Sequence, residues 1–105
     1  MDSPSLDYIN RLSNGDEGVF NTLITVIKKE FPIHKEEYFS SVEAKELRVV
    51  EEHVHRLKHK ISVFGMNDSY ELANQYEKNL RAGSFELKEE FESILMTITK
   101  YIETL

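Results

Sequence analysis

Apolar side chains recur at helical spacing along most of the chain. The most regular series advances in steps of three and four residues: Leu47, Val50, Val54, Leu57, Ile61 and Phe64. A second regular series occupies the C-terminus: Leu87, Phe91, Ile94, Ile98, Tyr101 and Leu105. This spacing places each series on one side of a helix and is typical of helices that pack one face against a shared core.

Three further segments have the same periodicity, namely a short one over 4–12, a long one over 20–42 and one over 68–80. Pro32 lies inside the long segment. Because proline lacks an N–H and clashes with the preceding turn, we expect a kink or a break near 28–31.

Residues that start and end helices fall between these segments. Candidate N-terminal caps are Ser3 (before Pro4), Asp16, Asp68 (with Glu71 at capping-box spacing) and Ser84. Candidate C-terminal glycines are Gly15, Gly65 and Gly83. Between the second and third helices no such residue occurs, and only a break in apolar phase indicates a turn near 41–44. Short connections join antiparallel neighbours, so we expect an all-α fold: an antiparallel four-helix bundle with a short additional N-terminal helix, in one domain over 1–105.

Composition narrows the possible functions. The 105 residues include no cysteine, which excludes disulfides, thiolate catalysis and cysteine-based zinc sites. The net charge is −6, and basic residues cluster only at 56–60, so we expect no nucleic-acid partner. No apolar run approaches the roughly 20 residues of a membrane span, and no secretory signal precedes the first helix, so we expect no membrane insertion and a cytoplasmic location.

Histidines are the side chains that titrate near neutral pH, and three of the four lie in the 47–64 helix. At ~100° per residue, His55 points about 130° away from the centre of the apolar seam, toward solvent. His53 lies about 70° off on the other side, at the core boundary. His59 is one turn beyond His55 and on the same outward side. We expect His55 and His59 to share an exposed face.

An exposed histidine is most often only a solvated side chain. A metal-binding or catalytic role for His55 and His59 therefore needs further support from the sequence. The His55 and His59 spacing suits a metal, but only Glu51 and Glu52 are candidate further ligands, so we expect no metal site. A nucleophilic pair of Ser62 and His55 lacks an oxyanion hole and a pocket. No glycine-rich phosphate loop is present, so no nucleotide site is expected.

From His55 the chain reads H-R-L-K-H-K-I-S-V-F-G. This segment resembles the signature of histidine-containing phosphotransfer (HPt) domains, which is H-x-L-K-G followed by small residues, an apolar residue and a glycine ten positions after the histidine. The matching positions are His55, Leu57, Lys58, Phe64 and Gly65. His59 stands where the family usually has glycine. The resemblance extends over nearly the whole chain, including the N-terminal helix, the region of Phe31 and the segment 72–84.

The resemblance implies a phosphorelay intermediate that has no kinase activity of its own. His55 would accept a phosphoryl group from an aspartyl phosphate on a response-regulator receiver domain and pass it to another receiver. Lys58, at an exposed position, and His59 would contact the phosphoryl oxygens. The magnesium ion of such transfers would belong to the receiver, so no cofactor is expected in this chain. A hybrid sensor kinase is a further implied partner, and the chain would then be its cytoplasmic part.

The docking face implied for the partner comprises Arg48, Glu51, His55, Lys58, His59 and Ser62. Val19, Val26 and Ile33, spaced by sevens, either extend this face or pack under the N-terminal helix. We expect a monomer, because four helices already close a core.

Two alternatives stay open. Because His59 replaces the family's glycine, the chain could be a non-catalytic module that docks on a receiver or kinase without carrying phosphate. It could also be a plain structural bundle that serves as a dimerisation element.

Overall fold

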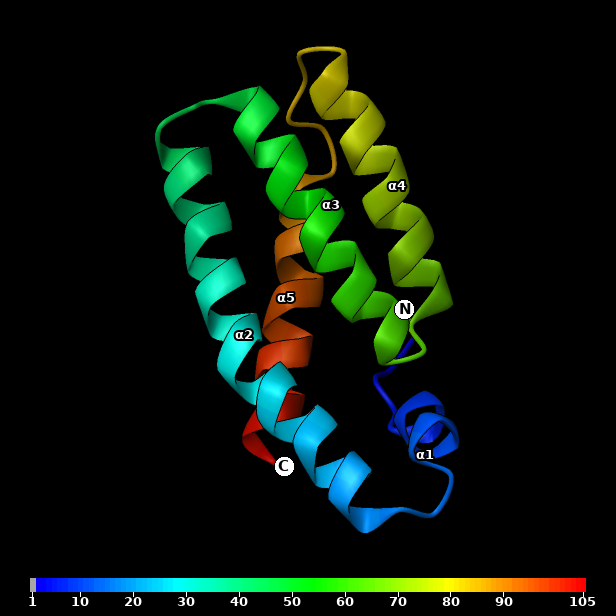
Figure 1. Cartoon of the computed structure of the whole chain (residues 1–105). Coiled ribbons are helices and arrows are strands. Elements are labelled where there is room, and N and C mark those ends of the chain that lie inside the picture. Colours follow the sequence, from blue (N-terminus) through cyan, green and yellow to red (C-terminus); the bar gives the residue numbers. More distant parts are fainter. Residues whose placement is uncertain (1) are drawn as a thin grey trace.

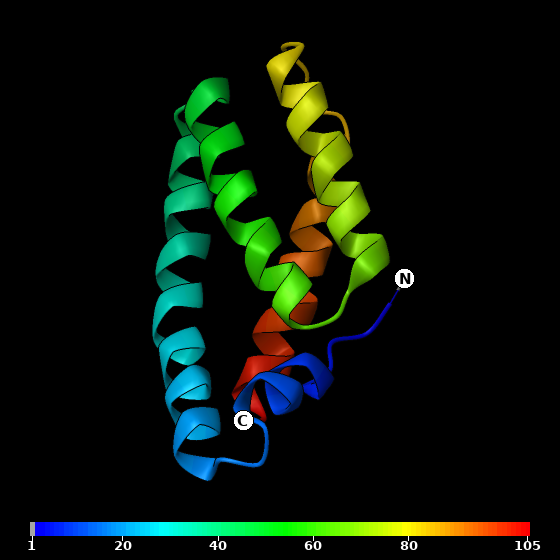
Figure 2. The same cartoon turned by 45° about the vertical axis from the view of Figure 1, so that its right-hand side comes forward.

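The computed structural model describes residues 2–105 and contains five helices: α1 (Asp7–Ser13), α2 (Glu17–Glu43), α3 (Leu47–Val63), α4 (Asn67–Arg81) and α5 (Lys88–Glu103). No strand occurs among these residues, which confirms the predicted all-α class. The four long helices lie side by side and run in alternating directions, while α1 lies at the lower end beside the start of α2 (Figures 1 and 2). The molecule measures 45 × 23 × 19 Å.

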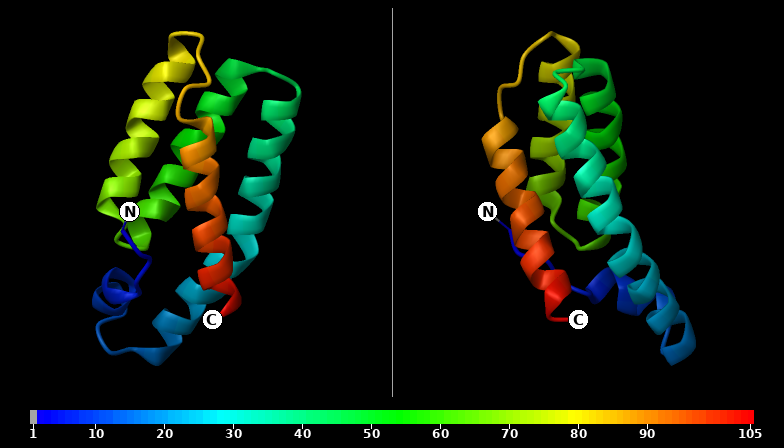
Figure 3. Two further views of the ribbon diagram at one scale, coloured as in Figure 1. Left: turned by 180° about the vertical axis from the view of Figure 1, so that it is seen from behind. Right: turned by 90° about the vertical axis from the view of Figure 1, so that its left-hand side faces the viewer.

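The core forms where the apolar faces of the helices meet. α3 packs against both α2 and α4, and α5 contacts α2 and α4 from behind (Figure 3). The α3 seam predicted from sequence is buried, with Val50, Val54, Leu57 and Ile61 at 0% exposure. In α5 the buried positions are Phe91, Ile94, Leu95, Ile98 and Ile102. Tyr101 and Leu105, which the α5 spacing placed on the seam, are only half-buried.

α2 is continuous from Glu17 to Glu43, so the expected break near 28–31 is wrong. The axis of the helix changes direction in the region of Pro32 (Figure 1), which agrees with the alternative of a kink. Proline deprives the Lys28 carbonyl of its helical donor, but Phe31 and Tyr38 anchor the helix in the core on either side. The exposed ring of Pro32 faces solvent and displaces no packing neighbour.

The helix boundaries depart from the sequence prediction at three of the four expected caps. Asp16 behaves as predicted and accepts a hydrogen bond from the Val19 amide at 3.1 Å. α1 starts at Asp7, later than a cap at Ser3 would place it. The Asp7 amide donates a hydrogen bond to the Ser5 hydroxyl. α5 starts at Lys88, after Leu87 in the left-handed region at φ 78°, and not at Ser84.

The start of α4 is the third departure, because Asp68 does not cap it. The helix begins at Asn67, and Met66 before it contributes no side-chain hydrogen bond. The carboxylate of Asp2 accepts instead from the Asp68 amide and from the buried Ser69 hydroxyl, both at 2.7 Å. The N-terminal segment thus supplies the cap that the local sequence was expected to contain.

Left-handed residues mark the ends of helices. Gly15, Gly65 and Gly83 have φ values of 82°, 73° and 87°, which confirms their predicted roles. The turn between α2 and α3 follows Glu43, slightly later than predicted, and Lys45 adopts the left-handed conformation there at φ 57°.

Three helices are joined by a buried polar network. The Tyr38 hydroxyl of α2 donates to a Glu92 carboxylate oxygen of α5 at 2.9 Å and shares a hydrogen bond with the Tyr76 hydroxyl of α4 at 2.9 Å. Burial raises the pKa of Tyr38 well above its ordinary value and the pKa of Tyr76 to about 12. Both phenols therefore keep their protons. Tyr38 donates to Glu92 and accepts from Tyr76, so neither hydroxyl lacks a hydrogen-bond partner inside the core.

Some apolar side chains stay outside the core. Val19, Val26 and Ile33 on α2 are 43%, 43% and 49% exposed. The alternative that this set packs under the N-terminal helix is therefore wrong. None of the helices in the described part of the chain is both long enough and apolar enough to cross a membrane.

Candidate functional site

His55 projects from the middle of α3 on the side opposite the buried seam. Its neighbours Val54 and Leu57 are fully buried, which fixes the rotation of the helix about its axis. The His55 side chain is consequently 59% exposed. Its predicted outward direction is confirmed.

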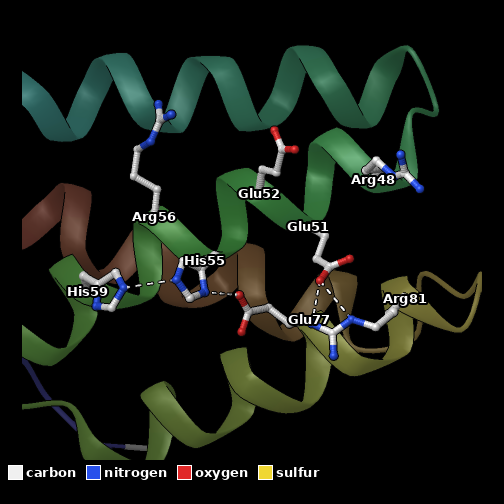
Figure 4. Close-up of a pocket in the computed structure, with 8 residues that line it drawn as sticks. All are labelled: Arg48, Glu51, Glu52, His55, Arg56, His59, Glu77 and Arg81. Carbon is white, nitrogen blue, oxygen red and sulfur yellow. Dashed lines mark hydrogen bonds and ion pairs between the residues drawn. The ribbon is translucent and has the colours of Figure 1, made fainter.

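Glu77 of α4 orients the His55 ring. Its Oε1 lies 2.8 Å from His55 Nδ1, and its side chain is only 8% exposed (Figure 4). An ionised carboxylate can only accept, so we assign the ring proton to Nδ1, which donates to Glu77. In the neutral ring the lone pair is then on Nε2, at the solvent-facing edge.

Lys58 lies under this pair. Its Nζ donates to Glu77 Oε2 and to Asn74 Oδ1, both at 2.7 Å, and its side chain is 10% exposed. The expectation that Lys58 occupies an exposed position is wrong, because α4 packs closely over this side of α3. The ammonium group neutralises the buried carboxylate that holds His55.

His59 covers the other nitrogen of His55. The two Nε2 atoms lie 3.4 Å apart, and the rings meet nearly at right angles with centroids 4.9 Å apart. Because Nε2 of His55 carries the lone pair, His59 Nε2–H is the donor in this contact. The side chain that replaces the family's glycine therefore lies against the one nitrogen of His55 that is free to react.

An open groove of about 660 Å³ surrounds the two histidines (Figure 4). Its lining residues are Arg48, Glu51, Glu52, His55, Arg56, His59, Glu77 and Arg81. Arg81 donates to Glu51 Oε2 from Nε at 3.1 Å and from Nη2 at 2.6 Å, and this hydrogen-bonded carboxylate raises the pKa of Arg81. Of the predicted partner-facing residues, Arg48 and Glu51 line the groove, whereas Ser62 is exposed but lies outside it.

Of the other two histidines, His34 is part of α2 and His53 of α3 lies near α2. The Nδ1 of His53 is 3.8 Å from Glu37 Oε2, and its side chain is 14% exposed, as expected for the core boundary. Burial, helped by the nearby Arg56 and Lys60 cations, lowers the pKa of His34. Neither ring contributes to the groove around His55.

The sequence prediction missed Glu77 and Arg81 of α4. Glu77 had a detectable signal, because it lies four residues after Ala73 and three before Leu80, on the buried face of α4. A carboxylate at such a position needs a partner. Nothing in the local pattern identifies that partner as the pair Lys58 and His55.

No protein-family model matches this chain, and neither a curated protein nor a solved structure is significantly similar to it. The resemblance to HPt domains therefore stays a prediction that rests on the residues around His55. Any function assigned to the chain has to be argued from the chemistry of the site.

Proposed function

We propose that this chain is a phosphocarrier resembling HPt domains, built as a single antiparallel four-helix bundle with a short additional N-terminal helix. His55 accepts a phosphoryl group from an aspartyl phosphate on a receiver domain and returns it to the aspartate of a second receiver. The observation that carries the proposal is the buried Glu77 carboxylate on Nδ1 of an exposed His55. This arrangement supplies an oriented nucleophilic nitrogen on an exposed face of α3, in an open groove that the active site of another protein can approach.

The transfer step follows from the tautomer of His55. The Nε2 lone pair attacks phosphorus, an Nε2–P bond forms, and the P–O bond to the aspartate breaks. The electron pair of that bond leaves with the carboxylate, and the ring gains a positive charge. The Nδ1–H remains hydrogen-bonded to Glu77, whose negative charge stabilises the charged ring. Such a reaction depends chiefly on positioning and charge neutralisation.

Lys58 and His59 affect the transfer in different ways. Lys58 acts through Glu77, because its ammonium group is already bound to that carboxylate. His59 must leave the Nε2 atom of His55 before phosphorus can approach. Once displaced, its N–H is within reach of the phosphoryl oxygens.

The expected partners are receiver domains and a hybrid sensor kinase on the cytoplasmic side, and the chain acts as a monomer. Arg48, Glu51 and Ser62 would face the partner. The chain supplies no nucleotide site, and the magnesium ion of the reaction would be held by the receiver.

The proposal is tested by incubating the chain with a phosphorylated receiver and measuring phosphate label that is stable in alkali and lost in acid. Glutamine variants at His34, His53, His55 and His59 are compared. Only His55→Gln should remain unlabelled, while its circular dichroism and thermal unfolding stay close to those of the parent chain. Label retained on His55→Gln would exclude this residue as the acceptor.

A non-catalytic docking module is the second candidate, and the contact between His59 and His55 Nε2 favours it. Such a module would bind the receiver without becoming labelled. Binding measured by calorimetry beside the labelling assay separates the two functions. Binding without label, in the parent chain and in His59→Gly alike, would support the docking module.

A further inference from the structure

The Nε2 atoms of His55 and His59 face each other across one turn of α3. They lie 3.4 Å apart on side chains that are open to solvent (Figure 4). Two ring nitrogens this close must share a proton or a common electrophile, because two lone pairs facing each other repel.

The separation of the two atoms matches a chelate. Zinc is bound by histidine at about 2.0–2.1 Å in tetrahedral geometry, which puts two ligand nitrogens ~3.3 Å apart. The observed 3.4 Å is within that bite. Both nitrogens come from the same rigid helix, four residues apart, a spacing that presents two imidazoles to one metal ion.

Glu77 provides the second observation. A metal-binding histidine usually donates its other ring N–H to a carboxylate, which fixes the tautomer and makes the ring a stronger ligand. His55 Nδ1 already has this partner at 2.8 Å, and Lys58 holds the same carboxylate in place from below. The ring is thus oriented with Nε2 outward before any ligand arrives.

We propose, in place of the sequence-based expectation of no metal site, that His55 and His59 together bind one divalent transition-metal ion through their Nε2 atoms. The proton that His59 Nε2 donates to His55 in the free chain then moves to His59 Nδ1, so that both Nε2 lone pairs face the metal. Imidazole favours copper, zinc and nickel, whereas magnesium and calcium favour oxygen ligands. Residues 2–105 hold no group of three or more metal-ligating side chains, so water completes the coordination shell. Glu51, one turn before His55 on α3, is engaged by Arg81.

Metal binding has a consequence for phosphoryl transfer to His55, and this consequence rests on the proposed function. The metal and the phosphoryl group require the same Nε2 lone pair of His55. A bound transition metal therefore blocks phosphorylation reversibly, and magnesium at millimolar concentration does not.

The test is a calorimetric titration of the untagged chain with Zn²⁺. We expect one ion per chain and no heat of binding with Mg²⁺. His55→Gln and His59→Gln should each lose measurable binding. Glu77→Gln should weaken binding by about 10–100-fold, the usual effect of removing a carboxylate behind a histidine ligand. His53→Gln, on the same helix but outside the pair, is the matched control and should bind as the parent does.

Several results would overturn the site. They are no Zn²⁺ binding by the parent chain, retained binding in His59→Gln, an equal loss in His53→Gln, or one ion per two chains. NMR of the histidine ring nitrogens adds a check that does not depend on the stability of the variants, since Zn²⁺ should shift Nε2 of His55 and His59 and spare the rings of His34 and His53. Because the titration uses no receiver, its failure is distinct from failure of the labelling experiment, which uses no transition metal.

Discussion

His55 is a surface residue whose reactivity depends on a buried one. Glu77 is almost fully enclosed, yet it reaches the exposed ring at 2.8 Å, and Lys58 balances its charge. The chemistry of the site is therefore set by contacts beneath the surface that the exposed face does not reveal. His59, in contrast, acts from the outside, directly on the nitrogen that would react.

Replacing His59 with glycine should speed phosphoryl transfer to His55, because it uncovers Nε2 and clears the approach of the partner. Glycine inside the helix should also lower the free energy of unfolding by about 1 kcal/mol. Rapid-quench labelling and urea unfolding measure the two effects. His59→Ala is the matched control, since it removes the ring but keeps a strong helix former. Slower transfer in both variants would mean that the His59 ring assists the reaction.

Replacing Lys58 with methionine should destabilise the fold, because it leaves the Glu77 carboxylate buried without its cation. A loss of about 2–3 kcal/mol in the free energy of unfolding is expected. Lys60→Met on the same helix is the control, because the ion pair of Lys60 with Glu30 is more exposed and should be worth less than about 1 kcal/mol. Equal losses in the two variants, measured by urea unfolding, would contradict the pairing of Lys58 with Glu77.

Among the helices, α4 depends most clearly on a distant residue. Its first amides have no local side-chain acceptor, and Asp2, 66 positions earlier than Asp68, provides one. The backbone amide of Ser5 also donates to the Phe64 carbonyl at 2.9 Å, so the N-terminal segment is attached at the connection between α3 and α4. That segment therefore stabilises the helix that carries Glu77.

Asp2→Ala should reduce the free energy of unfolding by about 1–2 kcal/mol, because it removes a helix cap and leaves the buried Ser69 hydroxyl without its acceptor. Asp68→Ala, at the position that the capping-box pattern favours, should cost less than about 0.5 kcal/mol. Thermal unfolding of both variants decides between the two caps. A larger loss in Asp68→Ala than in Asp2→Ala would contradict the observed cap.

Viewed as a whole, the molecule has two kinds of exposed surface. The groove between α3 and α4 is charged and contains His55, while the outer side of α2 exposes Val19, Val26 and Ile33. Partner-binding surfaces commonly combine apolar side chains with a polar rim. The charged groove also suits electrostatic steering of a partner.

Chemical-shift mapping with a receiver should perturb amides around the groove, including those of Arg48, Glu51 and Ser62. Perturbation should extend to the exposed α2 positions if they form part of the docking face. Raising the salt concentration should weaken binding, because charged side chains line the groove. Shifts confined to α5 would exclude this face as the docking site.

The sequence by itself determined the helices, their buried seams and the outward direction of His55. These features depend on the helical repeat, which relates residues three or four apart and needs no knowledge of neighbouring helices. The same local rule could detect that Glu77 is a carboxylate on a buried face. It could also locate the glycines that end α1, α3 and α4, because positive φ is a property of single residues.

Tertiary structure decided which side chains meet across helices. Glu77 lies 22 residues from His55, and Asp2 lies 66 residues from the amide that it caps, so no local pattern connects them. Lys58 is buried because α4, and not solvent, covers its side of α3. The helical repeat fixes the angle at which a side chain leaves its helix, but the packing of the neighbouring helix fixes what it meets at that angle.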